Sequence, residues 1–413
     1  MAVTVTLSGA VSGTEELRRN NLRALLRAVH TGGPMTRAQL TRLLGLNRST
    51  IGGLTTTLID LGLVAEQTAA QSAAAGAAVG GTRSARPSHL VVPRPENAVI
   101  AIDLGVDRVQ VALVGLGGIV LDRRVREHER GEHDVHRVVE RVATMAGELI
   151  AAAGHGCRIL GVAASVPGAI RSEDGMVQFA PNLGWHGEPF TQLLSERLGR
   201  PVRTGNDANL GVMAEHLRGA AVGRRHVIYL GVSVGIGGGF LVDGHLLSGA
   251  SGYAGEVGHL HVDAAGPECS CGDQGCWELK VGENRLLTLA GRAAGSGPDG
   301  VDEVIAAAIA GEAVAQDALT EIASWTGVGL RSLINLFNPE MIVVGGTLAQ
   351  VWPSIGDQVE EILSRRALLP PRADVAVLPA RLGRDSSLIG AAELAFEAIL
   401  EDPQSAVHCI AAS

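Results

Sequence analysis

The sequence has few aromatic residues, few cysteines and a single lysine, and each shortage narrows the fold or the setting. Aromatic residues make up 3% of the 413 residues, so the core must be built from Ala, Val, Leu and Ile. Five Cys in a chain of this length are not the disulfide framework of a small secreted domain. Lys280 is the sole lysine, which we interpret as coding bias.

Long apolar runs are also missing. The longest uncharged one, residues 227–242, has sixteen residues and is interrupted by five Gly, whereas a membrane-spanning helix needs about 20 apolar residues. The first ten residues, MAVTVTLSGA, lack the positively charged start of a signal peptide. We therefore expect a cytoplasmic protein with no membrane partner.

The net charge of −9 taken over the whole chain disfavours nucleic acid as a partner, but the charge is unevenly distributed. Residues 1–92 contain nine Arg and four acidic residues, a formal charge of +5, so the remaining residues carry −14. A basic N-terminal segment on an acidic body is the asymmetry of a nucleic-acid-facing module.

Residues 15–67 have the pattern of three helices and a turn. Thr36 and Gln39 form a capping-box pattern, Gly45 ends the helix that follows, and Asn47 can cap the next one. Two short helices joined by such a turn predict a helix-turn-helix, whose second helix enters the DNA major groove.

A basic turn between two apolar strands, ending near residue 92, predicts a wing. The alternative is a three-helix packing module with no DNA role. Early positions of the recognition helix face the groove, and Arg side chains in the wing can reach phosphate or the minor groove. The predicted DNA-binding residues are Arg48, Ser49, Thr50, Thr56, Arg83 and Arg86.

From residue 98 onward strands alternate with helices, which is typical of an α/β fold. The expected strands are 99–103, 109–114, 160–164, 201–204, 227–230, 238–242 and 341–344. The expected helices are 133–154, 187–198, 208–218, 301–310, 313–336 and 386–400.

The densest chemical motif is His259 followed by Cys269, Cys271 and Cys276 in a glycine-containing loop. Three thiolates and an imidazole are the ligand set of a closed tetrahedral zinc site, which is structural because no coordination position is open. His261 competes for the histidine position, and the alternative is three buried thiols beside an unrelated His.

Glycine turns follow two strands, at 99–105 and 231–239. Such turns can place backbone N–H groups against phosphate, although ligand-free hairpins are as common.

Taken together, the motifs resemble the ROK family of repressors and sugar kinases over nearly the whole chain. The matching segments are Asp103-Leu-Gly105, Val166-Pro-Gly168, Pro181-Asn182-Leu183, Asn206-Asp207-Ala208-Asn209, Gly235-Ile-Gly-Gly-Gly239, Ala254-Gly-Glu256-Val-Gly-His259, Cys276-Trp-Glu278 and Asn338-Pro339-Glu340 before Gly345-Gly346. The resemblance implies an actin-like (ribonuclease H-like) duplicated α/β body with a cleft between its halves, commonly a homodimer or homotetramer. The N-terminal winged helix resembles the repressor branch.

The family's sugar contacts correspond here to Asn206, Asp207, Glu256, His259 and Glu278. Carboxylates and an amide can bind the vicinal hydroxyls of a sugar or sugar phosphate. We expect a tail over 1–14, a winged helix-turn-helix over 15–92, a first subdomain over 97–212 completed by a helix over 386–413, and a second subdomain with the zinc loop over 213–385.

Two positions depart from the family's kinases. Asp107 replaces the Thr of the first phosphate loop and Val234 the Thr of the second, although Asp207 matches the kinase general base. Like charges about 4 Å apart repel by a few kcal/mol near a protein surface, so Asp107 disfavours ATP.

The sequence therefore predicts a non-enzymatic, sugar-responsive repressor of carbohydrate-use genes that binds a double-stranded DNA operator. The alternatives are a sugar kinase with an attached DNA-binding domain and a regulator that answers to a protein partner.

Overall fold

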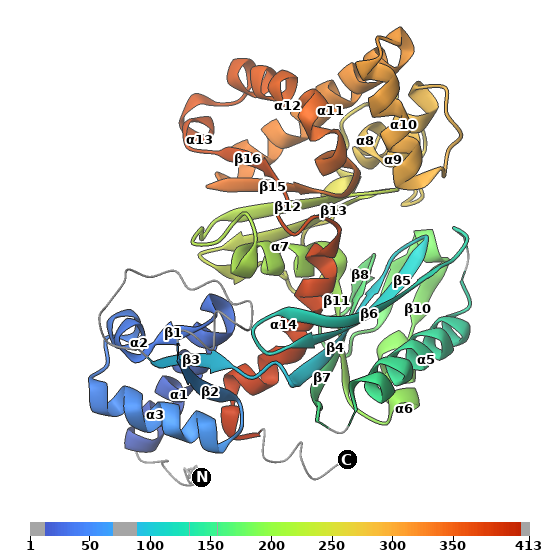
Figure 1. Cartoon of the computed structure of the whole chain (residues 1–413). Helices are drawn as coiled ribbons and strands as arrows, with labels where there is room; N and C mark the ends of the chain where they lie inside the picture. The colour runs from blue at the N-terminus through green and yellow to red at the C-terminus, as the bar shows by residue number, and fades with distance from the viewer. Residues whose placement is uncertain (1–12, 69–88, 132, 155, 406–413) are drawn as a thin grey trace, which may run out of the picture.

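The computed structural model describes residues 13–68, 89–131, 133–154 and 156–405, which form a small head and a body of two lobes (Figure 1). We use head for the described residues up to 93, first lobe for residues 97–206, and second lobe for residues 227–379. Helices α7 (Asp207–Arg218) and α14 (Ser386–Glu401) lie between these parts.

The three predicted helices of the head are confirmed as α1 (Gly13–Gly32), α2 (Arg37–Leu44) and α3 (Arg48–Asp60). The capping box is formed, because the Thr36 hydroxyl accepts from the Gln39 N–H and the Gln39 side chain accepts from the Thr36 N–H. Gly45 ends α2 with a left-handed φ of 66°, and the Asn47 side chain caps α3. Helix α1 begins inside the predicted tail, so the boundary at residue 14 was wrong by two residues.

The two strands of the predicted wing also form. β2 (Val64–Thr68) pairs antiparallel with β3 (His89–Pro93), and β1 (Met35–Thr36), which the pattern did not predict, pairs with β3. The turn that carries Arg83 and Arg86 lies outside the described residues.

The two lobes repeat one strand order. In each lobe, the first three strands form an antiparallel meander. The first strand of the meander also pairs, on its other edge, with a parallel strand, and a fifth strand pairs parallel to that one. The sheet orders are β11-β7-β4-β5-β6 and β14-β13-β12-β15-β16. The predicted duplicated body is therefore confirmed.

The strands of the first sheet are β4 (Asn97–Leu104), β5 (Arg108–Gly115), β6 (Ile119–Glu127), β7 (Arg158–Val166) and β11 (Val202–Asn206). Those of the second are β12 (Val227–Val232), β13 (Ile236–Val242), β14 (His245–Leu246), β15 (Met341–Gly345) and β16 (Ala376–Pro379). A small third sheet contains β8 (Ala169–Ile170), β9 (Val177–Ala180) and β10 (Trp185–Glu188).

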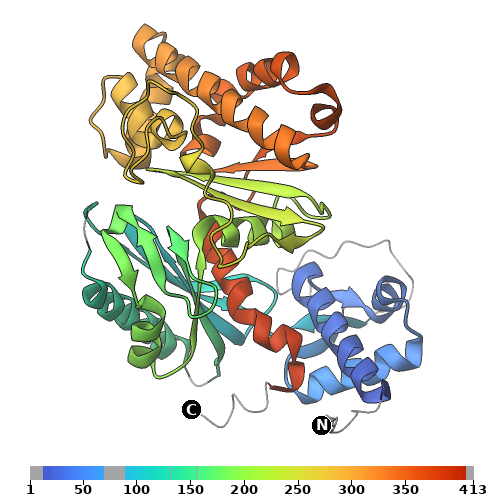
Figure 2. The same cartoon turned by 180° about the vertical axis from the view of Figure 1, so that it is seen from behind.

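The remaining helices cover the outer faces of the sheets (Figures 1 and 2). They are α5 (Val135–Ala153), α6 (Phe190–Leu198), α8 (Glu278–Val281), α9 (Glu283–Leu289), α10 (Gly297–Ile309), α11 (Ala313–Phe337), α12 (Gly346–Arg366) and α13 (Leu369–Ala373). Several expected bounds were wrong: α6 starts at Phe190 because β10 occupies the preceding residues, α10 starts at Gly297 rather than at 301, and α14 ends at Glu401 rather than reaching 413. Among the described residues, no helix has the length and apolar character needed to cross a membrane.

The head shares its core with the first lobe. One apolar cluster joins buried residues of α1 and α3 to residues of β5 and to the last turns of α14, including Leu26, Ile51, Val114, Phe396 and Ile399. Both views show α14 running from the lobes to the head (Figures 1 and 2). The head is therefore packed on the body through an apolar contact.

Candidate functional site

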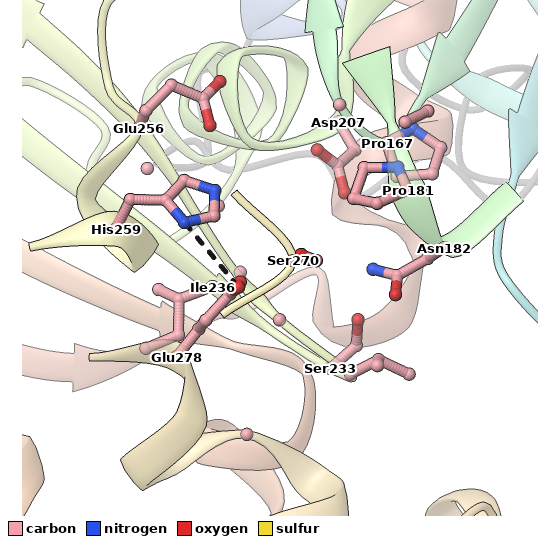
Figure 3. Close-up of a pocket in the computed structure, with 18 of the residues that line it drawn as sticks. Pro167, Pro181, Asn182, Asp207, Ser233, Ile236, Glu256, His259, Ser270 and Glu278 are labelled. Atoms are coloured by element: carbon pink, nitrogen blue, oxygen red, sulfur yellow. Dashed lines mark ion pairs between the residues drawn. The ribbon is translucent and has the colours of Figure 1, made fainter. Parts of the chain in front are cut away.

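A pocket of about 430 Å³ lies between the two lobes and receives side chains from both (Figure 3). The five residues predicted to contact a sugar all line it, although they come from segments as far apart as β11 and α8. They are Asn206, Asp207, Glu256, His259 and Glu278.

On the first-lobe side, Asn206 ends β11 and caps α7. Its Oδ1 accepts from the Asn209 N–H at 3.0 Å, and its Nδ2 donates to the Gly168 carbonyl at 3.0 Å and to Asp207 Oδ1 at 3.1 Å. These bonds hold the Asp207 carboxylate, which faces the space between the lobes in Figure 3.

The pKa of Asp207 is raised to about 7, chiefly because the carboxyl is removed from water. The Ala208 N–H, which donates to Oδ1, lowers this pKa, and the nearby charges of Asp103 and Glu256 raise it. Burial also raises the pKa of Asp103, whose Oδ2 accepts from Gln110 at 3.1 Å. A carboxyl with a pKa near neutrality can exchange a proton with a bound hydroxyl at physiological pH.

On the second-lobe side, His259 ends a 3₁₀ turn (Val257–His259) and Glu278 begins α8. His259 Nδ1 lies 3.6 Å from Cys269 Sγ and 3.7 Å from Glu278 Oε1. The second ring nitrogen points into the pocket, on the side of Glu256 (Figure 3). One ring therefore faces the cysteine loop and the pocket at once.

The four predicted metal ligands come together: the ligand atoms of His259, Cys269, Cys271 and Cys276 all lie within 4.8 Å of one another. Cys271 Sγ is 3.6 Å from Cys276 Sγ. Tetrahedral zinc with the usual bond lengths separates its ligand atoms by about 3.5–3.8 Å. The spacing therefore fits a tetrahedral ion.

His261 does not join this group, because its Nδ1 lies 2.7 Å from the Gln274 carbonyl at an exposed position. The backbone of His261 instead forms an isolated antiparallel β-bridge with Cys276, which closes the loop. The loop is compact: Gly275 has φ 70°, and a Cβ there would lie 1.8 Å from the Asp263 carbonyl oxygen. The Asp263 carboxylate accepts a 2.5 Å bond from Lys280, so the sole lysine braces the cysteine loop.

Without a cation two of these thiols resist ionisation, because burial raises the pKa of Cys269 and Cys276. By contrast, a hydrogen bond from the Asp273 N–H lowers the pKa of Cys271. Burial and the neighbouring thiols raise the pKa of Cys276 to about 12. A divalent cation favours the thiolates, and its binding would therefore release protons and order the loop.

Glycines of β13 and of the turn that precedes it serve packing. A Cβ on Gly239 would lie 2.2 Å from the Ala208 carbonyl oxygen of α7, and one on Gly235 would lie 2.6 Å from Glu278 Oε2. Glycine thus lets the strand approach both α7 and a pocket carboxylate closely, whether or not a phosphate binds.

Asp107 is not the uncompensated charge that the sequence suggested. Arg130 donates to Asp107 Oδ2 at 2.8 Å and to Glu283 Oε1 at 2.7 Å. Glu283 belongs to α9 of the second lobe and is 2% exposed. Arg130 therefore partly offsets the charge of Asp107 and ties the two lobes together, while the three side chains keep a formal charge of −1.

Several further polar side chains line the pocket, namely Asn182, Ser233, Ser270, Asn284, Arg285 and Thr288. Asn182 belongs to a motif noted in the sequence. The residues of α9 had no signal there, because their place in the pocket depends on how the helix packs.

The predicted DNA-binding residues that the structure describes share one helix. Arg48, Ser49 and Thr56 of α3 are exposed, and Thr50 is half-buried. The opposite side of α3 buries Ile51, Leu54 and Leu58 in the core of the head.

Comparison with known proteins adds three findings. Residues 99–398 match the sequence profile of the ROK family. A putative xylose repressor of Caldicellulosiruptor sp. (strain Rt8B.4) is 30% identical over 400 residues, covering 94% of this chain and 98% of its own. A glucokinase of Streptomyces coelicolor is 32% identical over 308 residues, covering 69% of this chain and 96% of its own.

Among solved structures, a ROK family transcriptional regulator described as a homologue of the E. coli MLC protein superposes with a TM-score of 0.75. It is 24% identical and covers 95% of this chain and 99% of its own. At that identity the match supports the fold, including the winged helix-turn-helix ahead of the actin-like body.

Proposed function

Because the chain belongs to the ROK family, we propose that it is a sugar-responsive transcriptional repressor. The head binds an operator in double-stranded DNA, and a sugar or sugar phosphate in the pocket changes the affinity for that operator. One observation carries the proposal: the similarity to a repressor extends over 94% of the chain, head included, whereas the similarity to a kinase covers 69%.

In the head, α3 is the recognition helix, with Arg48, Ser49, Thr50 and Thr56 toward the groove and Arg83 and Arg86 in the wing. A homodimer or homotetramer places two heads on operator half-sites about 34–36 Å apart. The domain limits we propose are 15–92 for DNA binding, 97–212 with α14 for the first subdomain, and 213–385 for the second.

In the body, Asn206, Asp207, Glu256, His259 and Glu278 hold the hydroxyls of the sugar. A structural zinc ion on His259, Cys269, Cys271 and Cys276 would fix the orientation of the imidazole. The spacing of the four ligand atoms supports this assignment. Xylose is the first ligand to test, because it is named for the repressor relative.

The chain has no kinase activity in this proposal. Arg130, Asp107 and Glu283 form ion pairs beside the first glycine turn, and Val234 lacks a hydroxyl in the second. The carboxylates of Asp107 and Glu283 and the missing hydroxyl at Val234 disfavour nucleotide phosphates at these turns.

A sugar kinase is the second candidate, and one observation favours it. Asp207 is retained and has a pKa of about 7, which suits a general base at neutral pH.

The test is operator binding, measured by fluorescence anisotropy with and without D-xylose, D-glucose and glucose 6-phosphate. An operator duplex selected from random DNA by the protein itself serves as the probe. A sugar that weakens binding supports the repressor. ADP release with any of these sugars, lost in Asp207→Asn, would instead establish the kinase.

A further inference from the structure

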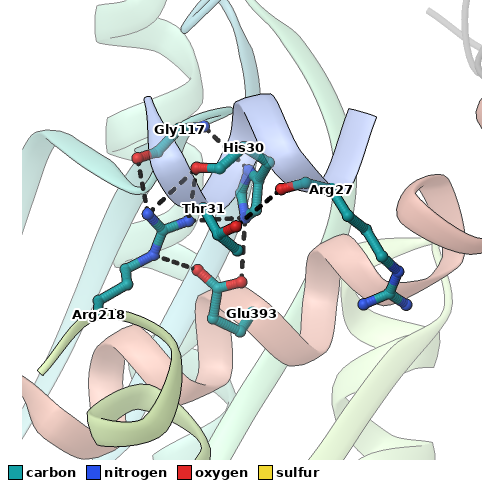
Figure 4. A network of polar contacts seen from close by, with 6 residues as sticks. All are labelled: Arg27, His30, Thr31, Gly117, Arg218 and Glu393. Atoms are coloured by element: carbon teal, nitrogen blue, oxygen red, sulfur yellow. Dashed lines mark hydrogen bonds and ion pairs between the residues drawn. The ribbon is translucent and has the colours of Figure 1, made fainter. Parts of the chain in front are cut away.

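A buried polar network joins the head to both helices that lie behind the pocket (Figure 4). It contains His30 of α1, Gly117 of the β5–β6 turn, Arg218 of α7 and Glu393 of α14. His30 is 0% exposed and Glu393 is 4% exposed. Four segments separated by up to 363 residues therefore meet at one buried point.

The hydrogen bonds of this network assign the tautomer of His30, and Arg218 Nη2 also packs 2.8 Å from Nε2, a contact that is not a hydrogen bond while Nε2 carries the proton. The Gly117 N–H donates to His30 Nδ1 at 3.0 Å, which assigns the ring proton to Nε2, and Nε2 then donates to Glu393 Oε2 at 3.0 Å. Arg218 Nε donates to Glu393 Oε1 at 2.6 Å, and its two Nη groups donate to the carbonyls of Gly117 and His30. Because His30 and Arg218 share the Glu393 carboxylate, losing one of them weakens the bonds that hold α1 to the body.

Helix α7 connects this network to the pocket. Asp207 is its first residue and Arg218 the last of its 12 residues, so the two lie about 16–17 Å apart along the helix axis. The helix has little freedom along its length, since a Cβ on Gly390 of α14 would lie 2.1 Å from the Leu210 carbonyl oxygen. A turn before Arg218, Glu215 accepts from the Leu382 N–H and the Ser386 hydroxyl at the start of α14, both at 2.9 Å. A displacement of one end of α7 is therefore transmitted to its other end.

On the head side, α1 is joined to the recognition helix. Leu22, Leu25 and Leu26 of α1 share a core with α3, and Arg18 Nη2 donates to Thr57 Oγ1 of α3 at 3.3 Å. A change in how α1 sits on the body therefore reorients α3.

We propose that His30, Arg218 and Glu393 form the relay through which occupancy of the pocket changes DNA affinity. The proposal rests on the proposed function and names the residues that carry its regulation. A ligand that draws α7, together with the α14 helix packed on it, toward the second lobe moves Arg218 and Glu393 away from His30 and releases α1 from its fixed position. The relay works because the network has a different free energy in the two arrangements.

The test is the ratio of operator dissociation constants with and without saturating sugar, using the panel sugar that binds the wild-type protein most tightly. His30→Gln removes the head's part of the network and leaves the Arg218–Glu393 ion pair in place, so the pocket and the body keep their structure. Glu393→Gln is the second variant. Arg27→Gln is the matched control, because Arg27 lies one turn earlier on α1 and pairs with Glu401 of α14 but not with α7.

Couplings between sites typically change affinity by about 5- to 150-fold. In the wild type and in Arg27→Gln, we expect the two operator dissociation constants to differ by a factor in this range. In His30→Gln and Glu393→Gln, we expect them to differ by less than about twofold. The sugar affinity of His30→Gln, measured by calorimetry, should equal that of the wild type. A His30→Gln protein that keeps the wild-type ratio and melts normally overturns the relay alone. A wild type whose operator affinity responds to none of the sugars overturns the proposed function, and the relay with it.

Discussion

The two lobes have the same strand order but hold their walls of the pocket in different ways. In the second lobe, His259 and Glu278 are fixed by a short loop whose four ligand atoms lie within 4.8 Å. In the first lobe, Asn206 and Asp207 sit at the start of α7, and their positions depend on helix contacts that reach the head.

This difference separates two tasks within one duplicated fold. A wall fixed by a local metal loop can be rigid without constraining distant parts of the chain. A wall carried on a long helix transmits its position to whatever the far end of the helix contacts. We infer that the second lobe fixes the ligand and the first lobe responds to it.

The largest effect that we predict is that of Cys276→Ser, which tests whether the cysteine loop fixes the second-lobe wall of the pocket. Removing one thiolate from a four-ligand site should abolish zinc binding, because structural zinc sites contribute most of the stability of their loops. We expect elemental analysis to find no bound zinc and calorimetry to find no sugar binding, while operator affinity stays near the wild-type value. Cys157→Ser is the control, since that half-buried thiol lies in the first lobe outside the metal group. Wild-type sugar affinity in Cys276→Ser would refute the role given to the loop.

The second prediction compares the close helix contacts of the two sheets. A Cβ on Gly239 of β13 would lie 2.2 Å from the Ala208 carbonyl oxygen of α7, and one on Gly161 of β7 would lie 2.6 Å from the Ala395 carbonyl oxygen of α14. Each Gly→Ala change should destabilise by about 1–3 kcal/mol, with Gly239→Ala the larger. Gly53→Ala in α3 has open space and should stabilise by about 1 kcal/mol. Thermal melting of the three variants measures these changes. Equal melting temperatures in Gly239→Ala, Gly161→Ala and Gly53→Ala would refute the packing role of Gly239 and Gly161.

Sequence reasoning succeeded where structure is specified locally. Thr36, Gly45 and Asn47 mark helix ends within a few residues of the positions they stabilise, and the head's helices followed from them. The metal group was equally accessible, because three of its ligands lie within eight residues of one another.

Sequence reasoning failed where the partner lies far along the chain. Asp107 read alone is a repulsive carboxylate, and only the fold brings Arg130 and Glu283 to it. His30 gave no signal in the sequence, since nothing near residue 30 indicates contacts with residues 218 and 393. The small sheet of β8 to β10 and the helix α12 were also missed.

The third prediction concerns the ion pairs that tie the lobes together. Arg130→Gln leaves Glu283 buried without its guanidinium partner, so the free energy of unfolding should fall by about 1–3 kcal/mol, less than for a fully buried pair because Arg130 is partly exposed. Arg126→Gln, whose side chain is 52% exposed and pairs with Glu148, should cost less than about 0.5 kcal/mol. Urea titration of both variants provides the comparison. Equal losses would show that Arg130 contributes no more than a surface pair.

The smallest effect that we predict is a pH dependence of sugar affinity that arises in the first lobe. With the pKa of Asp207 at about 7, its ionised fraction rises from about 0.1 at pH 6 to about 0.9 at pH 8. A sugar hydroxyl donates more strongly to a carboxylate than to a carboxyl, so sugar affinity should rise by up to about tenfold over this range.

The free energy of unfolding should change in the opposite direction. The carboxyl of the unfolded chain ionises near pH 4, so the contribution of Asp207 to stability declines as pH rises from about 4 to 7. Melting curves at each pH therefore accompany the calorimetry. Asp207→Asn should bind more weakly and lose the dependence, and an unchanged pH profile in that variant would assign the titration to another group, of which Asp103 and Glu256 are the neighbours to test next.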